Sequence, residues 1–254
     1  MNNSTLQTPN STLQNNSTLS VRFWKKMNIL YERLLLIVLV LVLLIVLWCM
    51  YDNYYVFNHT QDRISGYRPG TSQAAAAVGE KTITDDMVAW VTIDKTNIDY
   101  PVMQADDNVR YLNTDPFGDY SLAGSIFLDS RNSGDFSDDY SLVYGHHMEY
   151  GKMFGALDDF LDRGYLEKHR TGELIIGKDG DRTYGIEIFA AVKASARDEE
   201  VFDPMSDGIR QFIAENADVL IQDSYRDARI IGLSTCADGD ASSRIIVFGY
   251  LTEP

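Results

Sequence analysis

The sequence predicts a mainly β fold, a closed barrel of eight strands with a few short helices, preceded by a single transmembrane helix. Eight short apolar segments, separated by turn residues, lie between residues 89 and 250, and short strands at such spacing are typical of sandwiches and barrels. An apolar run without any charge occupies residues 34–50. A closed barrel is favoured because closure leaves no unpaired sheet edge.

The first segment, residues 1–28, is polar and repetitive. It carries three NSTLQ-type repeats, which begin at Asn3, Asn10 and Asn16. A segment of such low complexity buries too little apolar surface to fold alone. We therefore expect a disordered tail, to which the sequence assigns no function.

Residues 29–51 are expected to form the membrane helix. A helix that crosses a bilayer needs about 20 apolar residues, and this segment approaches that length. A cleaved signal peptide has an apolar core of only about 7–15 residues followed by small side chains, whereas bulky Trp48, Met50 and Tyr51 end this run. The helix is therefore expected to persist as an anchor.

The charges that flank this helix predict its orientation in the cell membrane. Four bases precede the uncharged run at residues 34–50, and the first base after it is Arg63; the four are Arg22, Lys25, Lys26 and Arg33. Positive charge is retained on the cytoplasmic side. We expect a single-pass protein with a cytoplasmic N-terminus and an extracellular remainder.

Two further segments follow the membrane helix. Residues 52–84 are expected to form a partly helical extracellular stalk, and residues 85–254 a single folded domain. Helical periodicity in that domain is clearest at residues 155–165 and 207–216. The expected strands are residues 89–93, 98–102, 125–128, 141–144, 173–176, 184–192, 228–233 and 243–250.

The part of the chain after the membrane helix is strongly acidic. The first 51 residues hold four bases and one acid, which leaves 18 bases and 36 acids, a net charge of −18, to the rest. Such a domain repels nucleic acid and anionic lipid. We therefore expect no nucleic-acid partner, and we interpret the charge as a means of solubility.

Cys236 is the one cysteine outside the predicted membrane helix, which contains Cys49. The two are not expected to meet, and an unpaired exported thiol is a liability unless its chemistry is used. A small buried thiol is the alternative interpretation. A histidine and Arg244 complete a set of groups that can carry out nucleophilic attack on a carbonyl carbon.

Several short motifs occur in order along the segment from about 85 to 250. They are residues 90–93, 98–104, 111–112, 124–129, 144–148, 153–154 and 233–236. Together they give this segment a resemblance to the sortases, and to their class B in particular. The motifs are weak one by one, but their order and the spacing from Cys236 to Arg244 make the match specific. The helix expected at 207–216 resembles an extra helix before the penultimate strand of class B, which favours that class over the calcium-using class A.

The resemblance implies a membrane-anchored cysteine transpeptidase of Gram-positive bacteria, built on an eight-stranded sortase barrel. Such enzymes cleave a C-terminal sorting motif of secreted surface proteins after its threonine and transfer the acyl group to a cell-wall peptide amine. A pilin polymerase, which uses a pilin lysine instead, is the alternative within the same chemistry. A hydrolase and a non-catalytic binding domain are further hypotheses, and the intact Cys, His and Arg set argues against the last.

The resemblance also implies the site residues. A thiol is only a few per cent thiolate at neutral pH, so it needs a base or a nearby cation. His146 would act as acid and then as base, and the guanidinium of Arg244 would stabilise the oxyanion. The catalytic residues are thus His146, Cys236 and Arg244, and the substrate-binding residues Leu233, Ser234 and Thr235.

Three details qualify this assignment. His147 competes with His146, because adjacent strand residues point to opposite faces; the family pattern Gly-His-x-Met selects His146. Gly232 stands where the family motif has threonine, a change expected to affect packing or the substrate wall. Asp238 is interpreted as a solvated loop acid rather than a tuning residue. Paired cysteines and suitably spaced histidines do not occur, so no metal or other cofactor is expected.

Overall fold

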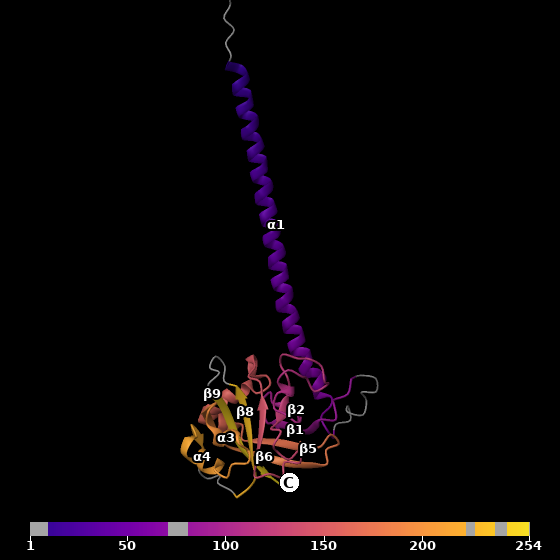
Figure 1. Cartoon of the computed structure of the whole chain (residues 1–254), viewed down its shortest axis with the longest axis vertical. Coiled ribbons are helices and arrows are strands. Elements are labelled where there is room, and N and C mark those ends of the chain that lie inside the picture. The colour runs from indigo at the N-terminus through magenta and orange to yellow at the C-terminus, as the bar shows by residue number, and fades with distance from the viewer. Residues whose placement is uncertain (1–9, 71–80, 222–226, 237–242, 254) are drawn as a thin grey trace, which may run out of the picture. The chain divides into compact units, whose positions relative to one another are not determined.

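Strands dominate the regular structure between residues 87 and 252. The computed structural model describes residues 10–70, 81–221, 227–236 and 243–253 (Figure 1). The strands in these ranges are β1 (Met87–Ile93), β2 (Asp99–Met103), β3 (Ile126–Leu128), β4 (Tyr140–Gly145), β5 (Thr171–Ile176), β6 (Arg182–Ser195), β7 (Val219–Leu220), β8 (Ile230–Cys236) and β9 (Ser243–Thr252). The helices are α1 (Asn10–Ser65), α2 (Arg163–Lys168), α3 (Glu199–Phe202) and α4 (Ile209–Asn216), with 3₁₀ helices η1 (Arg110–Leu112), η2 (Glu149–Gly151) and η3 (Gly155–Leu161).

Eight of these strands form the closed barrel that the sequence predicts. Their order is β5-β1-β2-β3-β4-β8-β9-β6, and β6 pairs with β5 again to close the ring. Each of the eight overlaps one predicted strand. The short strand β7, which pairs with β6 outside the ring, was not predicted because two residues are too few to show a strand pattern.

Strand β8 lies between β4 and β9 and joins segments that are distant in the sequence. Its pairing with β4 is parallel, from Tyr140 opposite Ile230 to Gly145 opposite Thr235. Its pairing with β9 is antiparallel and ends with Cys236 opposite Arg244. Parallel neighbours run in the same direction, so the C-terminal ends of β4 and β8 lie at the same edge of the barrel.

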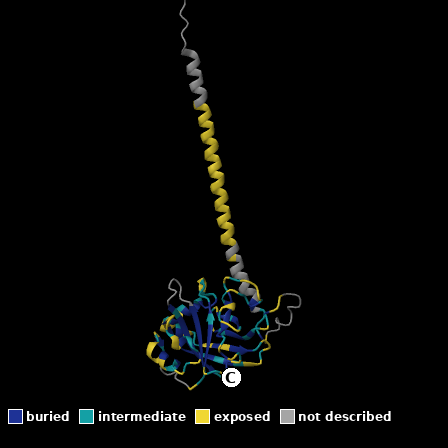
Figure 2. Cartoon of the chain, viewed as in Figure 1, coloured by how far each residue is buried: buried dark blue, intermediate teal, exposed yellow. Residues whose placement is uncertain are grey.

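Most of the buried side chains belong to the strands (Figure 2). One apolar cluster includes Val91, Val143 and Leu233, each with an exposed fraction of 0%. A second cluster combines residues of β6, β8 and β9 with residues of α3 and α4. The apolar face predicted for residues 207–216 is confirmed, since Ile209 and Phe212 of α4 are buried in this second cluster.

Helix α1 begins earlier than the sequence predicts. It runs from Asn10 to Ser65 and thus includes most of the segment for which low complexity predicts disorder; residues 1–9 lie outside the described ranges. The sequence offers a reason, because proline and glycine are absent from Asn10 to Ser65, while Pro9 precedes and Gly66 follows. The segment Val21–Tyr51 is long and apolar enough to cross a membrane, and its side chains are exposed.

The end of the expected stalk belongs to the folded domain. Ile64 and Ile83 are buried in a third cluster with Trp90 of β1. Arg68 donates a hydrogen bond of 2.8 Å to the carboxylate of Glu173 on β5. Residues 71–80 lie outside the description. The domain therefore begins before residue 85, because apolar side chains of the polar-looking segment before it pack on the strands.

Candidate functional site

Cys236 is the last residue of β8 and lies opposite Arg244 of β9. Directly opposed residues of an antiparallel pair have Cα atoms about 4.5–5.5 Å apart. The backbone thus brings a thiol-bearing residue and a guanidinium-bearing residue together at one barrel edge. The side chain of Cys236 and the whole of Asp238 lie outside what the structure describes.

His146 follows Gly145, the last residue of β4. Gly145 is opposite Thr235, so His146 and Cys236 are each the next residue along two neighbouring parallel strands. Gly145 also allows close packing here, since a Cβ at this position would lie 2.7 Å from the ring of Phe154 and 2.8 Å from Ile126. The register therefore brings the predicted histidine to the edge that carries the predicted nucleophile.

The imidazole of His146 has a defined hydrogen-bond partner. Its Nε2 atom lies 2.8 Å from the carbonyl oxygen of Leu112 in η1. A carbonyl oxygen only accepts, so Nε2 is the donor and carries a proton. In the neutral ring, Nδ1 is then the nitrogen that can accept a proton.

The neighbouring histidine has another partner. His147 Nε2 lies 2.9 Å from the Oδ2 atom of Asp158 in η3, and the backbone of His147 forms an isolated bridge with Met153. The side chain of His147 is thus engaged with η3, whose Leu157 and Phe160 are buried in the first apolar cluster. This contact gives His147 a structural role in joining η3 to the end of β4.

A cavity of about 210 Å³ includes several of the predicted residues. His146, Ser234, Thr235 and Arg244 line it, whereas Leu233 is fully buried in the first apolar cluster. Leu233 was expected in the substrate wall, and its contribution is instead to the core. The remaining lining residues, to which the sequence assigned no role, are Asn108, Leu112, Phe127, Tyr144 and Gly145.

Sequence signals existed for some of these additional residues. Leu112, Phe127, Tyr144 and Gly145 all belong to the motifs that carry the family resemblance, so the motifs marked the wall without indicating its function. Asn108 had no such signal, because it lies in a polar loop that only the fold brings to the cavity.

Two polar side chains in the wall differ in their hydrogen bonding. Tyr144 donates a hydrogen bond of 3.1 Å to Asp129, and burial, followed by the negative charge of Asp129, raises the pKa of Tyr144. The hydroxyl of Tyr144 therefore stays protonated near neutral pH and remains a hydrogen-bond donor. Ser234 is buried, and its Oγ atom has no hydrogen-bond partner in the described part of the chain.

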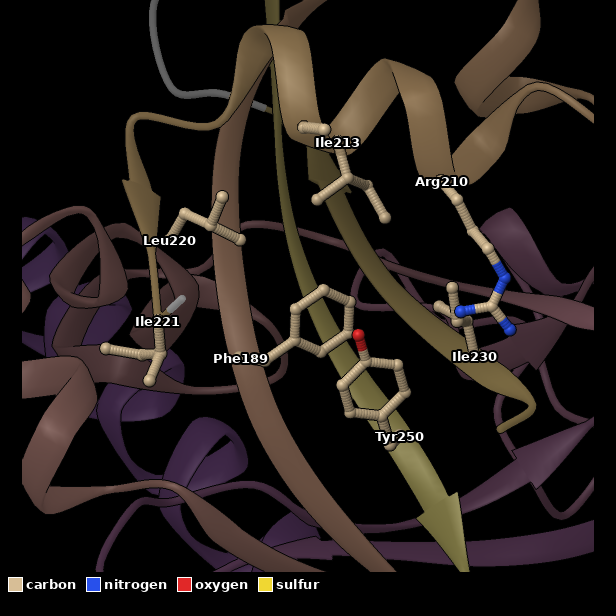
Figure 3. A pocket seen from close by; sticks show the side chains of 8 residues that line it. Phe189, Arg210, Ile213, Leu220, Ile221, Ile230 and Tyr250 are labelled. Carbon is tan, nitrogen blue, oxygen red and sulfur yellow. The ribbon is translucent and has the colours of Figure 1, made fainter. Parts of the chain in front are cut away.

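A second cavity, of about 180 Å³, lies beside α4 and involves β6, β7 and β9 (Figure 3). Its wall is mainly apolar and includes Phe189, Ile213 and Tyr250. Arg210 at this cavity donates a hydrogen bond to the carbonyl of Ala228. None of the predicted site residues lines this cavity, so it is separate from the candidate active site.

Metal ligands do not gather in the described ranges. No group of three or more His, Cys, Asp or Glu side chains there could hold a metal ion.

Comparison with known proteins identifies relatives over the barrel. A family model described as the sortase domain matches residues 91–252. Sortase B of Listeria monocytogenes is 35% identical over 163 residues, which cover 61% of this chain and 64% of that protein. Sortase B of Staphylococcus aureus is 33% identical over 180 residues, which cover 65% of this chain and 70% of that protein.

A solved structure shows the same architecture. A class B sortase of Streptococcus pyogenes involved in pilus biogenesis superimposes with a TM-score of 0.61 and 35% sequence identity, covering 66% of this chain and 94% of that one. In this chain α4 and the short strand β7 precede β8, the penultimate strand.

Proposed function

This chain belongs to the sortase family, in its class B, and we propose that it is a membrane-anchored cysteine transpeptidase. It cleaves a C-terminal sorting motif of secreted surface proteins after the threonine, forms a thioester on Cys236, and transfers the acyl group to a cell-wall peptide amine. The observation that carries this proposal is the shared barrel edge, at which His146 directly follows β4, Cys236 ends β8 and Arg244 is the second residue of β9.

In the first half-reaction the sulfur of Cys236 attacks the threonine carbonyl carbon. The carbonyl electrons move onto oxygen, and Arg244 stabilises that oxyanion with permanent positive charge and directional donors. When the carbonyl re-forms, the C–N bond breaks and protonated His146 gives a proton to the departing amine. The products are the thioester and the C-terminal fragment.

In the second half-reaction an incoming amine attacks the thioester. Neutral His146 takes the proton from that amine, the new C–N bond forms and the sulfur of Cys236 leaves. The contact from His146 Nε2 to the Leu112 carbonyl supports Nδ1 as the nitrogen that exchanges this proton, because Nε2 is already a donor. The engagement of His147 with Asp158 supports His146 as the acid and base.

The cavity of about 210 Å³ supports a substrate-binding role for Ser234 and Thr235. The Oγ atom of Ser234 is buried without a partner in the described part of the chain, so a polar group of a bound peptide would satisfy it. Asn108 and Tyr144 add polar groups to the same wall. Leu233 supports this wall from within the core.

Helix α1 supports a place at the cell membrane. The uncharged apolar run at residues 34–50, within the exposed segment Val21–Tyr51, would cross the bilayer, with the four bases from Arg22 to Arg33 on the cytoplasmic side and the barrel outside. An anchor of this kind would keep the enzyme near secreted proteins and near amines of the growing wall, which are its proposed partners.

The test uses fluorogenic peptides that share one fixed threonine and vary around it, with and without triglycine as an amine. We expect cleavage after threonine, and an amide product in place of the acid when triglycine is present. Cys236→Ala should abolish cleavage. Continued cleavage by this variant would exclude Cys236 as the nucleophile, and a product that never contains the amine would indicate a hydrolase.

A pilin polymerase is the second candidate function. The Streptococcus pyogenes relative is involved in pilus biogenesis, and the same thioester could react with a lysine amine. Competition between triglycine and a lysine-containing peptide for the thioester separates the two acceptors. If the protein binds peptides of the library but cleaves none of them, the result would favour a non-catalytic binding domain instead.

A further inference from the structure

A fully buried carboxylate lies behind the wall of the candidate active site. Asp129 directly follows β3, and its side chain has an exposed fraction of 0%. Arg131 binds it with two parallel contacts, from Nε to Oδ1 and from Nη2 to Oδ2, each 2.9 Å. The backbone N–H of Arg131 donates to Oδ1 at 3.0 Å. This bidentate geometry fixes the orientation of both side chains as well as the distance between them.

The same carboxylate holds two residues of the cavity wall. Its Oδ2 atom accepts a hydrogen bond of 2.9 Å from the Nδ2 atom of Asn108 and one of 3.1 Å from the hydroxyl of Tyr144. Asn108 in turn accepts a hydrogen bond of 2.8 Å from the backbone of Ser130. Asn108 and Tyr144 line the cavity, whereas Asp129 and Arg131 lie behind it.

The carboxylate remains charged at neutral pH. Burial acts to raise the pKa of Asp129, but hydrogen bonds and positive charge from Arg131 outweigh burial and hold the pKa below its usual value. A buried carboxylate without such a partner would be strongly unfavourable. Arg131 is therefore required for Asp129 to act as the common acceptor for the wall.

Arg131 also reaches the segment that follows β6. Its Nη2 atom donates 2.6 Å to the carbonyl oxygen of Phe202 in α3, and its Nη1 atom lies 3.2 Å from the carboxylate of Asp203. Strand β6, which leads into α3, carries Ala194 opposite Arg244. The guanidinium of Arg131 thus joins the buried carboxylate of Asp129 to α3. Helix α3 follows β6, the strand that lies beside Arg244, the candidate oxyanion donor.

We propose that Arg131 is a positioning residue that links α3 to the peptide-binding wall through Asp129. The proposal rests on the proposed transpeptidase function, because its expected consequence is a change in the affinity for the sorting peptide. Displacement of α3 moves the guanidinium, and the guanidinium fixes the carboxylate that orients the Asn108 amide and the Tyr144 phenol. The connection between β6 and β7 thereby controls how well the wall fits a peptide, whereas the reacting groups at Cys236 are unaffected.

The kinetic test compares Arg131→Met and Asp129→Asn with the unsubstituted protein. The substrate is the best-cleaved peptide from the threonine library, with triglycine as acceptor. We expect KM to rise about tenfold and kcat to change less than about threefold, since binding rather than chemistry is affected. Arg163→Met is the matched control, because Arg163 is an exposed arginine that contacts Glu167 and the Leu220 carbonyl away from the cavity.

A second measurement follows the linkage itself by amide hydrogen exchange. Asp129→Asn acts on the wall side, and we expect it to raise exchange about tenfold both in α3 and in residues 107–112. Amides of β9 serve as the reference for global stability. Equal acceleration in β9 would indicate simple destabilisation, and unchanged exchange in α3 would show that no linkage exists; either result overturns the proposal.

The two measurements keep the proposals distinguishable. If the unsubstituted protein cleaves no peptide of the library, the transpeptidase proposal fails, while exchange still decides whether Arg131 and Asp129 link α3 to the wall. If the unsubstituted protein cleaves but Arg131→Met leaves KM within twofold, the positioning role is wrong and the transpeptidase proposal stands.

Discussion

The ring of Tyr140 occupies the space into which a side chain at Gly232 would extend. A Cβ atom at Gly232 would lie 2.8 Å from the Tyr140 hydroxyl oxygen and 2.9 Å from the ring atom Cε2. The tyrosine is 1% exposed, and its hydroxyl donates a hydrogen bond of 2.9 Å to the Val201 carbonyl in α3. The family motif to which this segment is similar carries threonine at this position, whereas here Gly232 lies against a buried aromatic ring. Gly232 does not line the active-site cavity, and its role is in packing.

Restoring the family residue should therefore destabilise the protein. Gly232→Thr forces the β-carbon against a fully packed ring, and overpacking of this kind costs about 1–3 kcal/mol. Urea unfolding at neutral pH measures the difference. The double variant Gly232→Thr with Tyr140→Leu should recover part of the loss because the smaller side chain makes room.

Gly164→Ala is the control for glycine replacement. Gly164 is exposed on α2, so the change should stay within about 1 kcal/mol. An equal loss of stability in Gly164→Ala and Gly232→Thr would mean that the Tyr140 ring is not the cause.

Substitution should distinguish the roles of the two adjacent histidines. His146→Asn removes the proposed acid and base, and we expect peptide cleavage to fall by about 10²–10⁴-fold with little effect on stability. His147→Asn removes the contact with Asp158, so it should lower the thermal midpoint and leave most of the cleavage rate. Peptide cleavage and thermal unfolding of both variants provide the measurements. The reverse pattern would exchange the assigned roles.

Arg244 should be poorly replaced by lysine. The proposed oxyanion needs a donor that is both charged and directional, and loss of one such donor costs about 10²–10³-fold in kcat. Arg244→Lys keeps the charge but loses the planar arrangement of donors. Its kcat for peptide cleavage should therefore be less than about a tenth of that of the unsubstituted protein. A lysine variant with full kcat would show that charge alone is sufficient.

Alkaline pH should weaken the fold through buried tyrosines. Burial raises the pKa of Tyr100 and of Tyr111 to about 12 in each case, whereas an unfolded tyrosine titrates near 10. The unfolded chain thus loses protons first, so the stability from these groups is complete below about pH 10 and falls as pH rises to about 12. Urea midpoints across this range measure the decline.

Tyr100→Phe identifies one contributor to this decline. The variant should reduce the slope of stability against pH without abolishing it, since burial also raises the pKa of Tyr140 and Tyr144. The slope is the readout, because loss of the hydrogen bond from the Met153 N–H lowers stability at every pH. Midpoints that stay level from pH 9 to about 12 would contradict the effect of burial.

The strands of the barrel could be predicted from the sequence because each has its own local pattern. Segments such as the long β6 are rich in apolar and β-branched residues, and all eight barrel strands were found in this way. The extent of α1 could not be predicted from composition, because a polar repeat without proline or glycine continues a helix that the apolar segment begins. The two-residue β7 exists only through its pairing with β6.

The sequence proposes a set of residues for the candidate site but gives none of their contacts. Cys236, His146 and Arg244 are implied by the family resemblance, and their catalytic roles stay a prediction. Leu233 was placed in the substrate wall because it adjoins the nucleophile in sequence, although its side chain is in the core. The network around Asp129 was not predicted, because Asn108, Tyr144 and Phe202 approach the carboxylate and Arg131 only through the fold.

The insertion of β8 between β4 and β9 has a consequence for the order in which the protein folds. A parallel pair of strands so distant along the chain requires closure of a long loop, and such contacts form late and slowly. His146 is made long before Cys236 and Arg244 during synthesis. A nascent chain therefore carries the imidazole before the thiol, and the backbone brings Cys236 beside His146 and Arg244 only when β8 has paired with β4 and β9. We expect acyl transfer only once the ring of strands is complete.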